Sequence, residues 1–166
     1  MCKVLSGGCA GAVMNDDTDF LLTEYSGHGV RFLYPGYWEV REEQDGEDVI
    51  LTAAADDSCF WLLRVIADRP SPEQVLQDCL AALQEEYEDL EQQQEPILIA
   101  GRRALSCEVT FSCLELLNAA GFCSVRSGAA TLLIWWQCTD HELADVRPVF
   151  QSMTQSVGWA TAGEIG

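Results

Sequence analysis

The sequence predicts an α+β fold in which a mainly antiparallel sheet has helices packed against it. Three observations predict it: short apolar segments alternate with tight turns over most of the chain, a long amphipathic segment interrupts them, and a second amphipathic segment closes the series. Tight turns join antiparallel strands, because parallel strands need longer crossovers. Each amphipathic helix must bury its apolar face against the sheet, so a layered body follows.

The length and composition fit one domain with its own core. The chain has 166 residues, of which 48% are hydrophobic, so it can bury a core without disulfides and is not disordered by composition. We expect a flexible tail over residues 1–19, a single domain over residues 20–158 and a second tail over residues 159–166.

The stretch GVRFLYPGYWEV, residues 29–40, predicts two strands around a turn. Apolar and polar side chains alternate over residues 30–34, and Pro35 then holds the residue before it in the extended region. Large exposed apolar patches are uncommon on soluble proteins, so aromatic rings in such a run are more often buried than exposed as a docking patch. We expect the following rings to cover one edge of the sheet: Phe32, Tyr34, Tyr37 and Trp38.

Two further strands follow the first pair. The segment EEQDGED, residues 42–48, predicts a turn, because Asp-Gly is a strong hairpin signal. A strand over residues 49–54 comes next. Residues 59–67, CFWLLRVIA, are apolar almost throughout, which is typical of a central strand covered on both faces.

A helix is predicted from Pro72 to Leu90. Ser71 can cap it, Pro72 suits its first position, and Gln74 completes a capping box. Apolar residues form one stripe at helical spacing: Val75, Leu76, Cys79, Leu80, Leu83, Tyr87 and Leu90. Acidic residues occupy the opposite face.

Strands return in the second half. Residues 96–101, 107–113, 122–126 and 131–138 have strand patterns, and apolar residues alternate strictly with polar ones over 107–113. Trp135 and Trp136 are consecutive in a strand, so their rings point to opposite faces. A sheet with helices on both faces would bury both rings, whereas a two-layer fold would expose one.

The last amphipathic segment predicts a closing helix. Its inner face carries Val146, Val149, Phe150, Met153 and Val157. Proline in a helix interior removes a hydrogen bond, so we expect Asp145 to be the cap of this helix, which places Pro148 in the first turn.

The strong acidity limits the classes of partner. The chain carries 27 acidic and 9 basic side chains, a net charge of −18, which repels nucleic acid and anionic membrane surfaces. A basic protein surface would be attracted. We expect no membrane span, because no window has the roughly 18 apolar residues that a span needs.

Eight cysteines are expected to be small buried hydrophobes of a reduced, cytoplasmic protein. The opening MCKVLSGGCAGAV has too few apolar residues for a signal peptide, and LSGGC departs from a lipoprotein cleavage motif in the position of its leucine. No Cys-x-x-Cys pair occurs, and HELAD lacks the second histidine of a zinc-protease motif. We therefore expect no metal, no cofactor and no catalytic residue. One alternative stays open, a Cys138–His141 pair at the junction of strand and helix.

The order of these segments resembles the PsbP-like family, named after an extrinsic subunit of photosystem II and including the Ran guanine-nucleotide release factor and many bacterial proteins. The matching pieces are VRFLYPGYWEV, FWLLRVIA, the helix after RPSPEQ, IAGRRALSCEVTF and VRPVFQSMTQSV, which together extend over about residues 20–158. The resemblance implies an α-β-α sandwich that docks onto proteins and is not an enzyme. Some bacterial relatives resemble chaperones that hold apolar helices of secreted effectors. The chain lacks the transit peptide and basic docking residues of the photosystem subunit, so the resemblance implies no site residues.

These observations favour a non-enzymatic protein-binding or adaptor module, with a chaperone-like role included, in a bacterial protein. Its partner would offer a basic surface or an apolar segment. The alternative is a cysteine-dependent redox or hydrolytic enzyme. We expect a basic partner to contact the carboxylates of the predicted turn and of the outer helix face: Glu42, Glu43, Asp45, Glu47, Asp48, Glu85, Glu86, Glu88 and Asp89.

Overall fold

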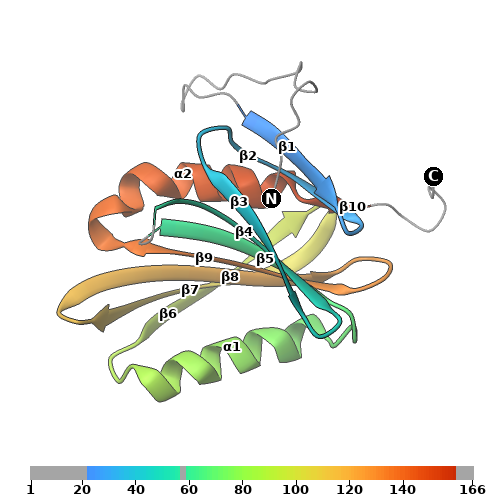
Figure 1. Ribbon diagram of the computed structural model, residues 1–166. Helices are drawn as coiled ribbons and strands as arrows, with labels where there is room; N and C mark the ends of the chain where they lie inside the picture. The colour runs from blue at the N-terminus through green and yellow to red at the C-terminus, as the bar shows by residue number, and fades with distance from the viewer. Residues whose placement is uncertain (1–21, 57–58, 160–166) are drawn as a thin grey trace.

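Two helices lie on opposite faces of an antiparallel sheet in the computed structural model (Figure 1). The structure describes residues 22–56 and 59–159, so the tails predicted over residues 1–19 and beyond Trp159 lie outside it. Neither of its helices has the length and apolar character needed to cross a membrane. The predicted α+β sandwich is confirmed.

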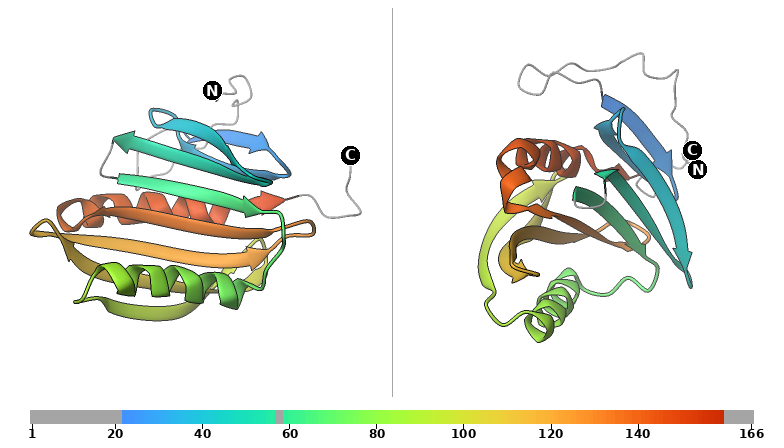
Figure 2. Two further views of the ribbon diagram at one scale, coloured as in Figure 1. Left: turned by 60° about the horizontal axis from the view of Figure 1, so that its bottom comes forward. Right: turned by 60° about the vertical axis from the view of Figure 1, so that its left-hand side comes forward.

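The large sheet has seven strands, all antiparallel to their neighbours. In spatial order they are β3 (Glu39–Asp45), β4 (Asp48–Asp56), β5 (Cys59–Ile66), β9 (Thr131–Thr139), β8 (Leu116–Arg126), β7 (Arg102–Cys113) and β6 (Glu91–Ile99). A separate sheet of three strands contains β1 (Leu22–Gly27), β2 (Val30–Pro35) and β10 (Gly158–Trp159). The right-hand view of Figure 2 shows the helices α1 (Pro72–Glu86) and α2 (Asp140–Ser156) on either side of the large sheet.

The aromatic stretch near the N-terminus builds the core under α2. Phe32, Tyr34 and Trp38 are buried, and Phe32 lies 4.8 Å from Trp61 between ring centroids. The prediction was wrong for Tyr37, which is 70% exposed. Its position explains the difference, because Tyr37 lies in the turn that the Trp38 N–H closes on the Pro35 carbonyl at 2.9 Å.

The second hairpin forms where predicted, but its turn is shorter. β3 continues to Asp45, so Glu42 and Glu43 lie on a strand and only Gly46 and Glu47 make the turn. Gly46 has a φ of 66°, a conformation that favours glycine. Both Glu42 and Glu43 are exposed. The sequence therefore has no alternation of apolar and polar residues there that would indicate a strand.

Helix α1 begins as predicted and ends earlier. The Gln74 N–H donates to the Ser71 hydroxyl at 3.1 Å, which satisfies one of the free donors of the first turn. The helix ends at Glu86 with Tyr87 as its C-cap. Leu90 therefore lies in the connection to β6, although it still packs against the α1 side of the core.

Helix α2 begins at Asp140, earlier than predicted, because Thr139 and not Asp145 is its cap. Thr139 is the N-cap, and its N–H and hydroxyl donate to the Glu142 carboxylate at 3.1 and 2.9 Å. Pro148 consequently lies inside the helix. Pro148 and Ala144, the residue four positions before it, are exposed, so water can reach the carbonyl that loses its helical partner.

The other differences between the predicted and the observed strands lie at the edges of the two sheets. The first six residues of β6 are exposed, so no apolar pattern marks the strand before Pro96. Trp159, which the sequence assigns to a tail, belongs to β10 and is 8% exposed. Its pairing partner, Val30, is more than a hundred residues away in the chain.

The large sheet separates two cores. Trp135 stacks on Phe122 toward α1 at 4.9 Å, and Trp136 stacks on Phe150 of α2 at 4.9 Å. Both rings are half-buried on opposite faces, which confirms that the fold has more than two layers.

A buried hydrogen bond joins α2 to β5. The Trp61 indole N–H donates to the Thr154 hydroxyl at 3.0 Å, and both residues are buried. Thr154→Val keeps the shape but leaves the indole donor unsatisfied, which should lower the free energy of unfolding by about 1–3 kcal/mol in urea titration. Thr154→Ser keeps the hydroxyl and should lose less. Equal stability of the Val variant and the parent would contradict this role.

Candidate functional site

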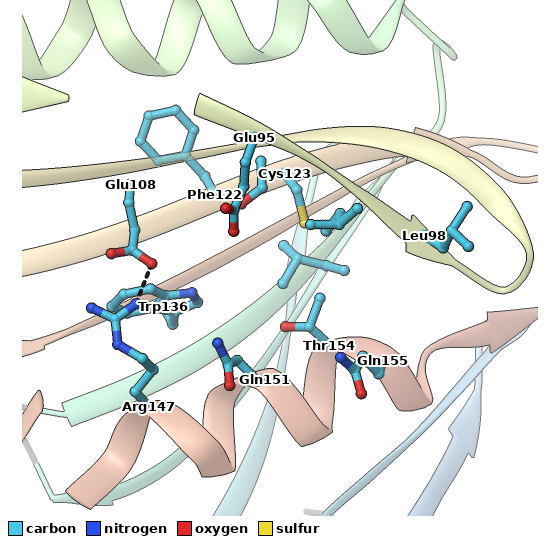
Figure 3. Close-up of a pocket in the computed structure, with 13 residues that line it drawn as sticks. Glu95, Leu98, Glu108, Phe122, Cys123, Trp136, Arg147, Gln151, Thr154 and Gln155 are labelled. Carbon is cyan, nitrogen blue, oxygen red and sulfur yellow. Dashed lines mark hydrogen bonds and ion pairs between the residues drawn. The ribbon is translucent and has the colours of Figure 1, made fainter. Parts of the chain in front are cut away.

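A groove of about 500 Å³ opens between α2 and the far end of the large sheet (Figure 3). We call it the α2 groove. Helix α2 contacts β8, β9 and one end of β6 and leaves part of the face of β6 and β7 open beside it. The lining includes Glu95, Ile97, Leu98, Glu108, Ile134, Trp136, Arg147, Gln151, Thr154 and Gln155. Its volume lies within the range of ligand sites, roughly 300–1,000 Å³.

The floor of the α2 groove is apolar. Ile134 of β9 is fully buried, Trp136 is half-buried, and Ile97 of β6 is packed against the same core. Phe122, which also borders the groove, points away from it toward α1 (Figure 3). A ligand seated here would therefore meet aliphatic side chains and the surface of one indole ring.

Gly121 makes room for the indole of Trp136. The two residues are paired between β8 and β9, and a Cβ on Gly121 would lie 2.4 Å from the indole ring. Any side chain at position 121 would push the ring out of its place over Phe150. The shape of the floor thus depends on a residue that contributes no side chain.

An ion pair lies at one end of the groove. The Arg147 guanidinium of α2 donates to the Glu108 carboxylate of β7 and lies 6.0 Å from the centroid of the Trp136 ring. The side chains of Arg147 and Glu108 are 35% and 34% exposed. A pair that is this accessible can exchange its partner for a charged group of a ligand at modest cost.

The rim of the groove is polar on one side and mixed on the other. Gln151, Thr154 and Gln155 extend from α2 toward the sheet (Figure 3), and both glutamines are exposed. On β6, Glu95 is exposed beside the apolar Ile97, whereas the side chain of Leu98 alternates with those of Ile97 and Ile99 and lies on the opposite face. An apolar floor with amide and carboxylate groups at its margin suits a peptide, whose backbone needs hydrogen bonds while its side chains need apolar contact.

The predicted carboxylates near the second hairpin lie outside the α2 groove, and several of them contact polar side chains of neighbouring strands. Glu42 accepts a hydrogen bond from the Tyr25 hydroxyl at 2.6 Å and lies 3.3 Å from the His28 ring, and these contacts lower its pKa. Asp45 and Asp48 each lie 2.8 Å from Arg64.

Opposing effects act on Asp48. Burial acts to raise its pKa, but hydrogen bonds from the Ala67 N–H and Arg64 outweigh burial, and the pKa is lowered. Both Asp48 and Glu42 therefore stay ionised in neutral solution. Glu43 and Glu47 are exposed.

The predicted carboxylates of the first helix are all exposed at the end of α1 and in the connection to β6. They are Glu85, Glu86, Glu88 and Asp89. Helix α1 lies on the face of the sheet opposite α2 (Figure 1). None of the predicted partner-binding residues lines the α2 groove.

The groove could not be predicted from the sequence for an identifiable reason. Its residues come from β6, β7, β8, β9 and α2, so no local spacing groups them. One signal was present: Arg147 is a lone basic residue on the closing amphipathic helix, and Glu108 is a carboxylate on the polar face of an alternating strand.

The structure does not support the Cys138–His141 pair. Cys138 is fully buried, whereas His141 is exposed. Burial raises the pKa of Cys138 to about 11, with Glu142 adding to the effect, and burial raises the pKa of Cys123 to about 12. A catalytic thiol needs the opposite shift. Among residues 22–56 and 59–159 no cluster of three metal-ligating side chains occurs.

These thiols should resist alkylation in the native protein. Because reactivity requires the thiolate, the rise in the pKa of Cys123 from 9.0 to about 12 should reduce its thiolate fraction about a thousandfold near neutral pH. Iodoacetamide at pH 7.5 followed by peptide mass spectrometry should find Cys123 and Cys138 unmodified until urea unfolds the chain. Rapid native labelling of Cys138 would restore the cysteine-enzyme alternative.

Gly121→Ala should disturb the groove floor. The added methyl group overlaps the Trp136 indole, so we expect a loss of about 1–3 kcal/mol in the free energy of unfolding and a changed near-ultraviolet circular dichroism signal. Gly128→Ala is the control, since nothing lies within 4 Å of a Cβ there. An equally small effect of both substitutions on stability would show that the Trp136 indole can adopt another position, and would contradict this role of Gly121.

Comparison with known proteins supports the fold. No protein-family model matches the sequence, and no curated protein matches it. Among solved structures, the Ran-binding protein Mog1p of Saccharomyces cerevisiae aligns with a TM-score of 0.59 at 10% identity, over 93% of this chain and 100% of Mog1p. The cyanobacterial PsbP (CyanoP) of Synechocystis sp. PCC 6803 aligns with a TM-score of 0.56 at 15% identity, over 96% of this chain and 98% of CyanoP.

A third match is the Pseudomonas aeruginosa protein PA94, whose function is unknown. It aligns with a TM-score of 0.52 at 16% identity, over 81% of this chain and 94% of that protein. At these identities the likeness is one of architecture. This chain has the fold of CyanoP and Mog1p, as the order of its segments predicted.

Proposed function

We propose that this protein is a non-enzymatic protein-binding module that holds a short apolar segment of a partner in the α2 groove. The observation that carries the proposal is the groove itself, an open site of about 500 Å³ whose floor is apolar and whose rim is polar. Binding sites of this kind use the floor for affinity and the rim for orientation.

The partner segment should carry basic residues beside its apolar ones. Glu95 and Glu108 line the groove against the single cation Arg147, and the whole chain has a net charge of −18. Carboxylates outside the groove, such as Glu43 and Glu47, would speed the encounter with a basic partner more than they would tighten the complex. This assigns the acidic surfaces a steering role and the groove the contact role.

The groove is a better candidate than the open edge of β6. An incoming strand could pair with this edge, but Pro96 lacks an N–H and exposed carboxylates at Glu91 and Glu95 flank it. Proline and charge are the usual protections of an edge strand against further pairing. The partner segment therefore needs only to be apolar and short, in helical or extended form, and a chaperone-like hold on such a segment is one form of this function.

Fold likeness lends limited support to this proposal. Mog1p is a Ran-binding protein, so this architecture can serve protein recognition. A shared fold does not imply a shared partner, so the support for the chemistry of the partner is the groove alone. The cysteine-enzyme alternative is less favoured because Cys123 and Cys138 are buried with a raised pKa.

A peptide experiment tests the proposal. A 12-residue peptide of alternating leucine and lysine should protect amides of β6 and the second half of α2 from hydrogen exchange, while its leucine–glutamate counterpart should not. Glu95→Lys should weaken this binding about tenfold or more, because it replaces a carboxylate at the margin of the groove with a charge that repels the lysines of the peptide.

Glu86→Lys is the matched control. Glu86 is also an exposed glutamate, but it lies on α1, on the opposite face of the large sheet. Protection of α1 instead of β6, equal binding of the acidic peptide, or equal loss in both variants would overturn the proposal.

A further inference from the structure

A second cavity, of about 390 Å³, lies on the opposite face of the large sheet, where the start of α1 covers the ends of β7 and β8. We call it the arginine pocket. Its lining residues are Pro72, Glu73, Leu76, Pro96, Arg102, Arg103, Ala104, Leu105, Ser124, Val125 and Arg126. Three arginines and one carboxylate, Glu73, thus contribute to the lining of this pocket, in a protein whose net charge is −18.

The positive charge in the arginine pocket is not neutralised from within. Arg41, Arg64 and Arg147 have carboxylate partners elsewhere, whereas in the described part of the chain no ion pair involves the arginines of this pocket. Arg102 lies 6.0 Å from the Trp159 ring centroid. Arg103 and Arg126 therefore remain as the two cations available to a ligand.

The strand register places Arg103 and Arg126 on the same face of the sheet. Leu105 of β7 and Ser124 of β8 are the last pair of their ladder at this end, and each arginine lies two residues beyond this pair, toward the same end of the sheet. Because side chains alternate along a strand, both arginines lie on the face that carries Leu105 and Ser124. Like charges on one face repel each other, so an anion between them would reduce this repulsion.

Arg126 also has an unused donor. Its Nη2 donates to the Arg69 carbonyl at 3.0 Å, but its Nε is buried and has no hydrogen-bond partner in the described part of the chain. A buried donor without an acceptor is unfavourable. Two oxygens of one carboxylate or phosphate group can accept from a guanidinium at once, which no neutral acceptor matches.

The rest of the arginine pocket is apolar. Leu76 of α1 is buried, while Pro96 and Leu105 are exposed beside it. A free inorganic ion would leave these surfaces wet. The pocket is better matched by a ligand with an anionic head and an apolar body.

We propose that the arginine pocket binds a small organic oxyanion, a carboxylate or phosphate monoester attached to an aliphatic body, between Arg103 and Arg126. This inference does not rest on the proposed protein-binding function, because the α2 groove lies on the other face of the sheet. It adds a small-molecule site to the molecule.

Four probes test the site on the full-length protein at low salt: hexyl phosphate, hexanoate, hexanol and inorganic phosphate. Hexyl phosphate or hexanoate should raise the melting temperature and shift amide resonances of Leu105, Ser124 and Arg126, and comparison of the two identifies the preferred head group. Arg103→Gln should weaken the better of them about tenfold or more, the effect of one charged hydrogen bond. The unliganded variant should melt no lower than the parent, because the substitution removes a like-charge neighbour.

Arg41→Gln is the matched control, since Arg41 is an exposed strand arginine paired with Glu39. It should leave anion binding unchanged. The proposal is overturned if neither anionic hexyl compound binds, if hexanol or inorganic phosphate binds as well as they do, if resonances shift only elsewhere, or if both variants bind like the parent.

Discussion

The burial of Phe150 between two tryptophan rings is the contact on which the rest of the structure depends. Phe150 projects from α2, is fully buried, and meets Trp136 of the large sheet face to face at 4.9 Å and Trp38 edge to face at 6.2 Å. Trp38 lies in the connection between β2 of the small sheet and β3 of the large sheet. The Phe150 side chain therefore joins α2 to the large sheet and to this connection, and aromatic contacts of this geometry add stability beyond their buried area.

This packing also decides where the molecule stays open. With α2 held over Trp136 by Phe150, the helix cannot cover β6 and β7 as well, and the α2 groove remains between them. Thr154 also holds α2 against β5, because its hydroxyl accepts a hydrogen bond from the buried Trp61 indole. The open surface is thus a consequence of the core, and a partner could use it without any rearrangement of the helices.

The two faces of the large sheet differ in charge. The α2 groove contains an internally paired arginine, Arg147, beside carboxylates, whereas the arginine pocket under α1 concentrates cations with one carboxylate among them. In a chain with 27 acidic and 9 basic residues, an arginine without a carboxylate partner is unexpected. The division suggests two kinds of ligand on two faces, an apolar segment with basic residues on one and an organic anion on the other.

The sequence by itself determined the local elements and the class of fold. The alternation of Cys107, Val109 and Phe111, the Ser71 cap and the Asp45–Gly46 turn all lie in patterns whose physical cause is short-range: side-chain alternation, an N-cap hydrogen bond and a positive φ. These features were predicted correctly. The opposite directions of Trp135 and Trp136 follow from the same geometry.

Only the tertiary structure decided what depends on contacts between distant segments. Trp159 became a strand residue by pairing with Val30, α2 extended past Pro148 because Glu142 accepts hydrogen bonds from Thr139 and the proline faces solvent, and the candidate sites combine residues from several strands and a helix. No spacing along the chain encodes such groupings. They are set by strand order and by the position of α2, which follow from the burial of the whole core.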